Sequence, residues 1–475
     1  MADVSQLSIL LILLMEVTVL TWVEYRAWKT FYTPLCTLML PYTFVLLVTI
    51  AIAGNFGYVP FNYDSIWVWI YGLPLFALPS YAFASLMRNV ECGMWNENSL
   101  SAGNAEASVF GSRKGTNLIP HSTFHFPRIL LIICGIVILL LFAKLYTTLS
   151  GSLFLFGTDE FADDFSGHGI WAHIRTLLIP LIILMFYQVG KGCRWLWIPI
   201  LLMLILQFVN MVKGTIVIPI FAALLMRLYT GKTRMSLRLI LTMIGLGVLV
   251  FFLIYIVIPI MGNGSAADMK LVQFVGEHIV HYFTSGTMGW SFDIDQNMPD
   301  RKDFEYIVAP FVNIVRAIKG EELVSVVNRF YWCTGTDVTT LTNVRTFFGT
   351  LYIYSDAWQF ITYTLFLSTF IYAWKVATIF RQSVYLDIIL FYYCGLLMMG
   401  WFEFYFFHLD TIEIPLITLF YGWLVHQTAG IRPPLTPPTQ EGKQAVEAPP
   451  TQEGKQAVEA PPTQEGKERK EVALG

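Results

Sequence analysis

The sequence predicts an all-α, polytopic membrane protein, and two observations carry this prediction. Hydrophobic residue types make up 56% of the 475 residues and charged types only 13%, against about 25% charged residues in an ordinary soluble domain. The apolar residues also gather in long runs with short polar joins. Many of the runs approach the roughly 20 residues that a helix needs to cross a bilayer. We therefore expect about eleven transmembrane helices.

The first apolar run, Gln6–Trp22, is expected to be a retained span. A signal peptide has a basic leader and a small-residue cleavage site, whereas this leader carries Asp3 without Lys or Arg, and no such site follows. The further apolar runs are Pro34–Gly54, Ser65–Leu86, Ile129–Leu149, His173–Val189, Trp195–Val209, Thr215–Tyr229, Leu237–Met261, Leu351–Ala377, Val384–Phe407 and Ile412–His426.

The Lys and Arg residues between the runs predict the orientation of the chain, because short cytoplasmic segments hold the excess of these residues. Alternate joins carry cations such as Arg26, Arg88, Arg194 and Arg238, and the joins between them carry almost none. The join Gly151–Gly169, for example, contains acidic residues and no cation. We therefore predict that the N-terminus lies outside and the C-terminus in the cytoplasm.

This orientation places the long segment 262–350 outside, and the segment is too long for a simple connection. Met269–Phe283 and Asp303–Val327 carry apolar residues at helical spacing, and Thr284–Arg301 between them is rich in turn-forming residues. We expect two or three amphipathic helices that lie over the outer face.

The chain divides into a membrane domain, residues 1–430, and a tail, residues 431–475. From Pro437 the twelve-residue unit PPTQEGKQAVEA occurs twice and then begins a third time. A segment of this composition has little apolar surface to bury, so we expect it to be disordered. An inert repeat expansion is the simpler interpretation, and recruitment of a cytoplasmic partner is the alternative.

Several kinds of partner and site are not expected. The net charge of −3 gives no polybasic surface for nucleic acid. The six cysteines are scattered without CxxC or metal-ligand spacing, and no Rossmann GxGxxG or HExxH motif is present. We expect no nucleic acid, no metal and no cofactor.

Three cations at the outer ends of apolar runs are candidates for an anion site. Lys144, Arg175 and Lys213 lie at about the same depth, on a side that is otherwise poor in Lys and Arg. Each alone could extend its charge to the interface. Together they favour a bound lipid phosphate or pyrophosphate. Arg329 and Arg345, in the long loop, could add to this site.

Acidic residues inside the apolar runs leave a transporter as an alternative, because carboxylates in a membrane can form a proton or sodium path. These residues are Glu16, Asp356, Asp387 and Glu403. They are dispersed along the chain, and the two halves show no matching pair of helices broken by Gly or Pro, as transporter repeats would have.

A series of short motifs follows in a fixed order along the chain: FGTDEF at 156–161, SGHG at 166–169, HIR at 173–175, NMVKG at 210–214, HYFTSG at 281–286 and TNVRT at 342–346. This series, together with about eleven spans and one large outer loop, resembles the oligosaccharide repeat-unit polymerases, the O-antigen polymerase-like proteins of bacterial polysaccharide clusters. The resemblance covers residues 11–429. Members of that family often carry arginine-rich patterns in two outer loops, and here the acidic loop has no Arg before Arg175.

The resemblance implies a metal-independent glycosyltransferase of the bacterial inner membrane, with a fold shared with O-antigen ligases. Such an enzyme joins undecaprenyl-pyrophosphate-linked repeat units at the periplasmic face. The implied partners are the lipid-linked donor and acceptor, membrane lipid, and a chain-length regulator and flippase of the same pathway. An O-antigen ligase-like enzyme and a polysaccharide or lipid-linked sugar transporter are the alternatives.

The implied chemistry needs cations that stabilise the leaving pyrophosphate and a base near the acceptor hydroxyl. The candidates for the pyrophosphate are Lys144, Arg175, Lys213, Arg329 and Asn343, with Arg345 as a further catalytic cation. The candidates for the base are Asp159, Glu160, His281, Asp293 and Asp295, and the sequence alone does not choose among them.

Overall fold

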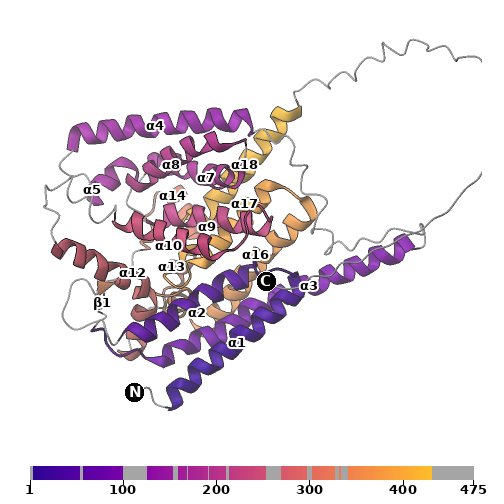
Figure 1. Cartoon of the computed structure of the whole chain (residues 1–475), viewed down its shortest axis with the longest axis vertical. Coiled ribbons are helices and arrows are strands. Elements are labelled where there is room, and N and C mark those ends of the chain that lie inside the picture. The colour runs from indigo at the N-terminus through magenta and orange to yellow at the C-terminus, as the bar shows by residue number, and fades with distance from the viewer. Residues whose placement is uncertain are drawn as a thin grey trace, which may run out of the picture. The chain divides into compact units, whose positions relative to one another are not determined.

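The computed structural model describes residues 4–53, 57–99, 126–152, 159–167, 169–190, 192–209, 213–252, 269–296, 302–326, 331–332 and 341–430. Within these ranges the chain is built almost entirely of helices, with one short pair of antiparallel strands (Figure 1). The predicted tail and Arg329 lie outside the described residues.

The elements before the long loop are α1 (Val4–Trp28), α2 (Pro34–Ile52), η2 (Tyr63–Ile66), α3 (Trp67–Ser99), α4 (Arg128–Ser152), α5 (Asp159–Ala162), η5 (Asp163–Gly167), α6 (Gly169–Thr176), α7 (Leu178–Gln188), η6 (Arg194–Leu196), α8 (Trp197–Val209), α9 (Lys213–Tyr229) and α10 (Leu237–Phe252). The later elements are α12 (Met269–Asp295), α13 (Phe304–Ile307), α14 (Ala309–Lys319), β1 (Tyr331–Trp332), β2 (Leu341–Thr342), α15 (Phe347–Tyr354), α16 (Ala357–Arg381), α17 (Val384–Met398), η9 (Tyr405–Phe407) and α18 (Asp410–Gly430). Every apolar run of the sequence therefore contains helix.

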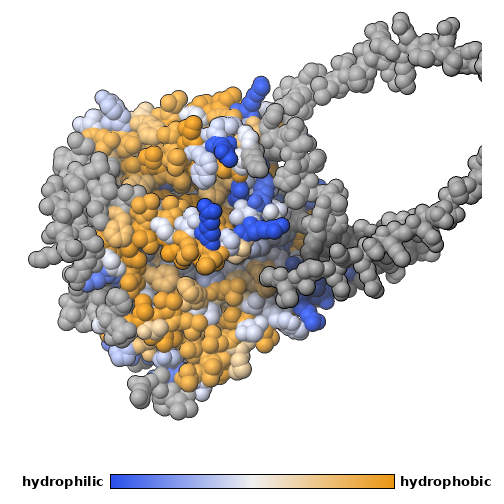
Figure 2. Space-filling model, viewed as in Figure 1, coloured by the Kyte–Doolittle hydropathy of each residue, from blue (hydrophilic) through white to orange (hydrophobic). Residues whose placement is uncertain are grey.

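The length and hydropathy of the helices identify an all-α membrane protein. Six described helices are long and apolar enough to cross a bilayer: Gln6–Trp28, Pro34–Ile52, Tyr63–Arg88, Arg128–Gly151, Gly169–Gln188 and Ala357–Arg381. Four shorter apolar helices accompany them: Arg194–Val209, Gly214–Tyr229, Leu237–Leu249 and Val384–Met398. Apolar side chains cover most of the face that Figure 2 shows, as a surface in contact with hydrocarbon requires. The class of fold is thus confirmed, and the number of eleven spans stays a prediction.

The predicted span Leu351–Ala377 is wrong as a single helix. α15 ends at Tyr354, and Asp356 caps the start of α16. The Asp356 carboxylate accepts a hydrogen bond from the Gln359 backbone N–H (2.7 Å), and the Gln359 side-chain oxygen accepts one from the Asp356 N–H (2.9 Å). This reciprocal capping box gives Asp356 a structural role at a helix start.

The predicted turn region Thr284–Arg301 is also wrong over its first part, because α12 continues as a helix to Asp295. The glycines that indicated turns are instead sites of close packing. An added Cβ at Gly286 would overlap backbone carbonyl oxygens of the segment after α17, and one at Gly289 would lie 2.6 Å from the Val344 oxygen. The glycines therefore let other segments approach the helix backbone closely.

The second amphipathic stretch, predicted to continue to Val327, ends as a helix at Lys319. Gly320 adopts a left-handed conformation with φ of 70°. Its N–H donates to the Ala317 carbonyl (3.3 Å), and the next N–H, of Glu321, donates to the Arg316 carbonyl (2.9 Å). A left-handed glycine with these bonds is a common helix terminator.

A buried carboxylate ties together α1, α3 and α16. Glu24 is fully buried and accepts hydrogen bonds from the Tyr372 hydroxyl (2.5 Å) and the Ser80 hydroxyl (2.7 Å). The Trp28 indole N–H donates to Ser80 (2.8 Å), and the Lys375 ammonium lies 4.9 Å from the centre of the Trp28 ring. Several donors and a nearby cation thus compensate the buried acid, as its desolvation requires.

Candidate functional site

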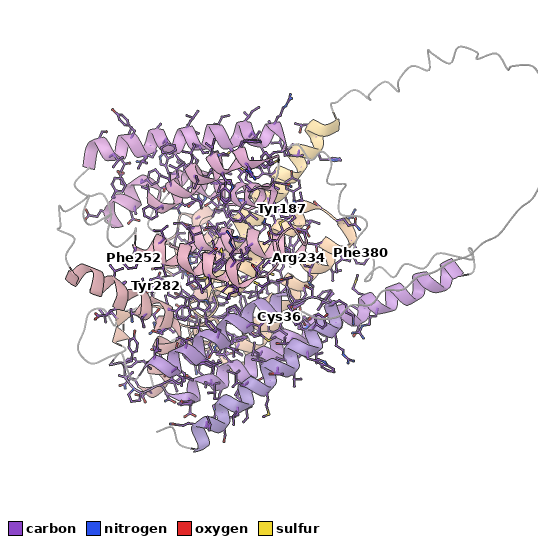
Figure 3. All side chains as sticks on the ribbon, in the orientation of Figure 1. Cys36, Tyr187, Arg234, Phe252, Tyr282 and Phe380 are labelled. Carbon is purple, nitrogen blue, oxygen red and sulfur yellow. The ribbon has the colours of Figure 1, made fainter. Side chains whose placement is uncertain are left out.

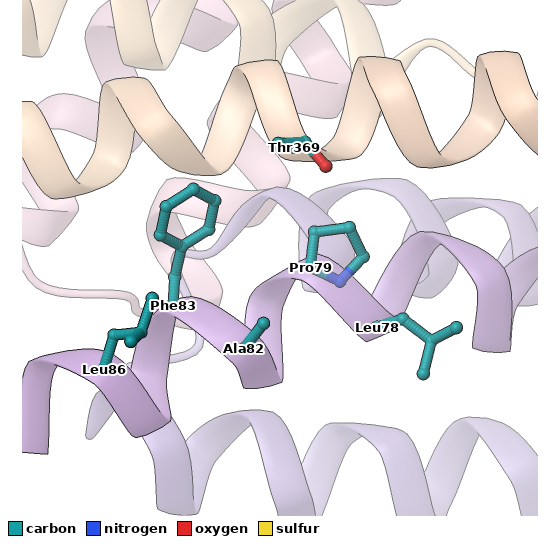
Figure 4. Close-up of a pocket in the computed structure, with 6 residues that line it drawn as sticks. All are labelled: Leu78, Pro79, Ala82, Phe83, Leu86 and Thr369. Carbon is teal, nitrogen blue, oxygen red and sulfur yellow. The ribbon is translucent and has the colours of Figure 1, made fainter.

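An open pocket between α3 and α16 can be set aside as a site of chemistry. It is lined by Leu78, Pro79, Ala82, Phe83, Leu86 and Thr369 (Figure 4). Five of these side chains are apolar and none is ionisable, so the pocket cannot transfer a proton or bind a charge.

The ionisable side chains gather instead at one end of the helical bundle, here named the loop end. It is defined by α12, by the segment 341–346 and by the segment 399–409, and it lies toward the left of Figure 1. Figure 3 places Tyr282 of α12 toward this end and Arg234 and Phe380 away from it. We describe the loop end residue by residue.

His281 of α12 is buried and uses both ring nitrogens. Its Nδ1 lies 3.3 Å from the Tyr58 hydroxyl, and its Nε2 lies 2.8 Å from the Leu341 carbonyl oxygen. A carbonyl only accepts, so Nε2 carries the proton and Nδ1 accepts from Tyr58. Burial lowers the pKa of His281, and the bond to Leu341 opposes this shift. His281 therefore ties α12 to β2 as a neutral side chain.

Arg345 and Asp293 form a buried, bidentate ion pair. The Arg345 Nε lies 2.6 Å from one carboxylate oxygen of Asp293, and Nη2 lies 3.0 Å from the other. The two side chains are only 2% and 5% exposed. Paired hydrogen bonds of this kind hold an arginine in a fixed orientation. The pair joins α12 to the start of α15.

The segment 399–409 follows α17, which ends at Met398. It packs against the side of α12 that carries Gly286. Gly286 lies against the Trp401 and Phe402 carbonyls. The Phe402 ring stacks on Tyr282, with 4.7 Å between ring centroids. The sequence predicts Glu403 inside a span. In the structure it lies beyond the end of α17, in the segment that packs beside α12.

Glu403 is a partly exposed residue, although protein surrounds its carboxylate closely. Burial raises its pKa to about 8, while the Arg345 charge opposes this shift. Burial and the charge of Glu403 raise the pKa of Tyr405 well above its usual value, and Tyr282 adds to this effect. Two tyrosines, one carboxylate and one guanidinium thus form a single electrostatic group.

Tyr405 also contacts the start of α9. A Cβ added to Gly214 would lie 3.2 Å from the Tyr405 ring, so the first turn of α9 passes beside this tyrosine. Lys213 is the first residue of that helix, and its side chain lies outside the described part of the structure. The N–H groups at a helix start favour anions. The structure therefore brings Lys213 next to the group that contains Glu403.

Arg175 of α6 is buried among polar groups of η5, α8 and α18. Its guanidinium donates to the Ser166 hydroxyl (3.4 Å), and its carbonyl accepts from the Gln207 side chain (3.4 Å). Asp410 and Glu413 lie near enough to interact with its charge. Two carboxylates therefore oppose the positive charge of Arg175, and an anion would have to compete with them.

The other predicted site residues lie at the edge of this region or apart from it. Lys144 pairs with Asp164 across 3.4 Å. Glu160, on α5, is exposed, and Asn343 is partly exposed between β2 and α15. Asp295 is exposed and accepts a hydrogen bond from its neighbour Gln296. The side chain of Asp159 and all of Arg329 lie outside the described residues.

The sequence reasoning missed the roles of Glu403, Tyr405 and Tyr282. Glu403 was placed in a span because the apolar run Val384–Phe407 hides the end of α17. The signal that could have found it is Gly400, whose N–H bonds back to Leu397 (2.9 Å) at the helix end. The contact between His173 and Glu413 was missed as well. The His173 Nδ1 lies 3.0 Å from a carboxylate oxygen of Glu413.

The comparisons with known proteins identify a family whose function is unknown. Residues 57–430 match the model of a family of unknown function, DUF6337. The chain belongs to this family. The match includes the whole group around Glu403 and the His281–Tyr58 contact. No curated protein and no solved structure matches the chain.

Proposed function

We propose that this member of the DUF6337 family is a membrane-embedded glycosyltransferase that polymerises lipid-linked oligosaccharide repeat units at the outer face of the bacterial inner membrane. Donor glycan is transferred from undecaprenyl pyrophosphate to a sugar hydroxyl of a lipid-linked acceptor. The ordered motif series of the sequence, which resembles repeat-unit polymerases, supports this reaction class.

One structural observation supports the proposal most directly. Segments far apart in the sequence bring ionisable and hydroxyl-bearing side chains together at one end of an otherwise apolar bundle. Tyr58 and His281 are 223 residues apart, and Arg345 and Asp293 are 52 apart. Ionisable groups are costly in a membrane protein and are retained mainly where they function. A site at one end suits a substrate whose lipid tail stays in the bilayer.

The roles follow from the surroundings of each residue. Lys213 at the start of α9 and Arg175 are proposed to stabilise the leaving pyrophosphate. Lys144 lies at the edge and adds long-range positive potential. Arg345 is committed to Asp293 and acts by orienting the segment before α15. No metal takes part in this scheme.

Gene deletion and complementation test the proposal. The deletion strain should lose its ladder of long glycans and accumulate single lipid-linked repeat units. Wild-type protein should restore the ladder. Lys213→Ala and Arg175→Ala should not, because loss of one group that stabilises a developing anion lowers the rate by about 10²–10³. Immunoblots of the membrane fraction confirm equal protein levels.

The matched control is Arg316→Ala, which removes a partly exposed cation of α14 that pairs with Glu305. This variant should give normal ladders. The other outcomes identify the alternatives. Long glycans on undecaprenyl that are never passed on would indicate a ligase, and repeat units trapped in the cytoplasm would indicate a transporter. An unchanged ladder in the deletion strain would exclude all three.

A further inference from the structure

We propose that Glu403 is the base that takes the proton from the acceptor hydroxyl, and that Tyr282 and Tyr405 form the surface on which the acceptor sugar lies. This inference rests on the proposed glycosyl transfer. It assigns the base and part of the acceptor surface to Glu403 and Tyr405, two residues that the sequence motifs do not include.

The first argument is that two of the candidate bases, His281 and Asp293, are already engaged in buried contacts. Both nitrogens of His281 are in hydrogen bonds, and one of them faces a carbonyl. Both carboxylate oxygens of Asp293 are bonded to Arg345. A base must reach the proton it removes with a free lone pair, so these two groups would first have to break buried contacts.

The second argument is the state of the Glu403 carboxylate. Glu403 is a partly exposed residue, and among the described residues no side chain or backbone N–H forms a hydrogen bond or ion pair with its carboxylate. A carboxylate that is surrounded by protein but unbonded keeps its lone pairs available. Burial raises its pKa to about 8, which makes it a stronger base than an ordinary glutamate.

The third argument is the chemistry of the neighbouring side chains. Tyr282 and Tyr405 are partly exposed, and both interact electrostatically with one another or with Glu403. Stacking on Phe402 fixes the orientation of the Tyr282 ring. A sugar has apolar C–H faces and a rim of hydroxyls, and tyrosine offers both a ring face and a polar hydroxyl. This surface fits a neutral hydroxyl-rich acceptor.

The fourth argument is that Tyr405 is near both parts of the proposed site. It lies close to the start of α9 at Gly214, beside the proposed anion position at Lys213, and it interacts with Glu403. An acceptor on Tyr405 would therefore have the base beside it and the leaving pyrophosphate near the first turn of α9.

The reaction step balances with these groups alone. Glu403 takes the hydroxyl proton while the hydroxyl oxygen forms a bond to the anomeric carbon of the donor. The bond between that carbon and the pyrophosphate oxygen breaks, and the electron pair leaves with the pyrophosphate. The proton on Glu403 is then passed to water or to the released phosphate.

The pH dependence follows from the same group. The base must be ionised, so the rate should rise with pH through about 8 and then level off. Among the described residues, the groups that interact electrostatically with Glu403 are Arg345, which is paired with Asp293, and Tyr405 on its own segment, and Tyr282 of α12 interacts in turn with Tyr405. The raised pKa of Tyr405 keeps this tyrosine neutral in this range, so Glu403 dominates the profile.

The test uses purified full-length protein in proteoliposomes, with lipid-linked repeat units isolated from the deletion strain. Glu403→Gln, which keeps size but cannot accept the proton, should lower kcat by about 10²–10⁴. The acceptor KM should change little. Tyr282→Ala and Tyr405→Ala should instead raise the acceptor KM. The matched control is Glu322→Gln, an exposed acid of the long loop 262–350, which should leave kcat and KM unchanged.

The outcomes separate this inference from the proposed function. If wild-type protein polymerises the units and Glu403→Gln keeps its rate and pH profile, the assignment of the base is wrong and the polymerase remains. If wild-type protein does not polymerise the units and the deletion strain keeps its ladder, both are wrong. Should Glu403→Gln fail to fold, Glu403→Asp is used. It should retain a reduced rate that still rises with pH, and a flat profile would overturn the assignment.

Discussion

At the scale of single residues, the loop end shows how one buried carboxylate fixes one guanidinium. Asp293 accepts two hydrogen bonds from Arg345, and both side chains are almost fully buried. A buried ion pair contributes little net stability compared with apolar residues, but removal of one partner leaves an uncompensated charge. The stability of the protein is therefore sensitive to substitution of either residue alone and tolerant of substitution of both together.

We accordingly expect Asp293→Ala to destabilise the protein by about 3–5 kcal/mol. The apparent melting temperature of the purified protein in detergent should fall clearly. The double variant Asp293→Leu with Arg345→Met should recover much of the loss, since no charge remains buried. Fluorescence-detected thermal unfolding measures both. Equal melting temperatures for wild type and Asp293→Ala would mean that water reaches the pair.

The chemical types of the site residues were accessible from the sequence, but their partners were not. His281 and Arg345 stand out as polar residues in the long loop 262–350. Tyr58, which bonds to His281, is 223 residues away, and no periodicity reports such a contact. For the same reason the sequence could not show that Asp293 and His281, two candidates for the base, are bound to other groups.

At the scale of elements, two glycines of α12, Gly276 and Gly286, lie in different surroundings. Gly286 touches carbonyl oxygens of the segment 399–409, and Gly276 has open space around it. Sequence composition treats Gly286 and its polar neighbours as turn-forming residues, whereas Gly276 lies inside the stretch predicted to be helical. This is why the continuation of α12 to Asp295 was not predicted.

These two glycines give a matched pair of substitutions on one helix. Gly276→Ala should stabilise the protein by about 0.5–1 kcal/mol, because alanine is the better helix former at an open site. Gly286→Ala should destabilise it, because the methyl group would collide with the Trp401 and Phe402 carbonyls. The displaced segment should also carry Glu403 away from Arg345.

Thermal unfolding of both variants measures the stability effects, and the polymerisation assay measures the displacement. Gly276→Ala should keep full activity, whereas Gly286→Ala should lose activity together with stability. Similar stability changes for the two substitutions would show that α12 does not pack closely on the segment 399–409.

Helix positions were predicted well because apolar runs of span length have few alternative structures. Helix ends were predicted less well, since they depend on local hydrogen bonds. Asp356 caps a helix with Gln359, and Gly320 ends one in a left-handed conformation. Both signals are present in the sequence, but apolar neighbours on both sides of Asp356 mask the first.

At the scale of the whole molecule, two cations away from the loop end, Arg227 and Lys232, have structural partners. Arg227 near the end of α9 donates to the carbonyls of Phe186 (3.0 Å), Tyr187 (3.1 Å) and Val189 (2.7 Å). It thereby satisfies carbonyls at the end of α7, which have no helical partner. The ammonium of Lys232 lies 3.5 Å from the centre of the Tyr187 ring.

The cation distribution predicts that this end faces the cytoplasm and the loop end faces out. An alkaline phosphatase fused after Glu322 should be active, because that enzyme folds only outside the cytoplasm, and one fused after Leu435 should be inactive. A green fluorescent protein should give the opposite pattern. Active phosphatase in the tail and inactive phosphatase in the loop would reverse the orientation and remove the proposed site from the outer face.

The buried contact between Glu24 and Tyr372 has a consequence for biosynthesis. The two residues are 348 positions apart, so at roughly 5–20 residues per second the ribosome needs about 17–70 s to make the second after the first. During that interval α1 has entered the membrane without the hydroxyl and the cation that later compensate its acid. Until then Glu24 must be protonated, lie near the aqueous boundary of the membrane, or be shielded by the insertion machinery. The N-terminal helices therefore cannot reach their final packing until α16 has been inserted.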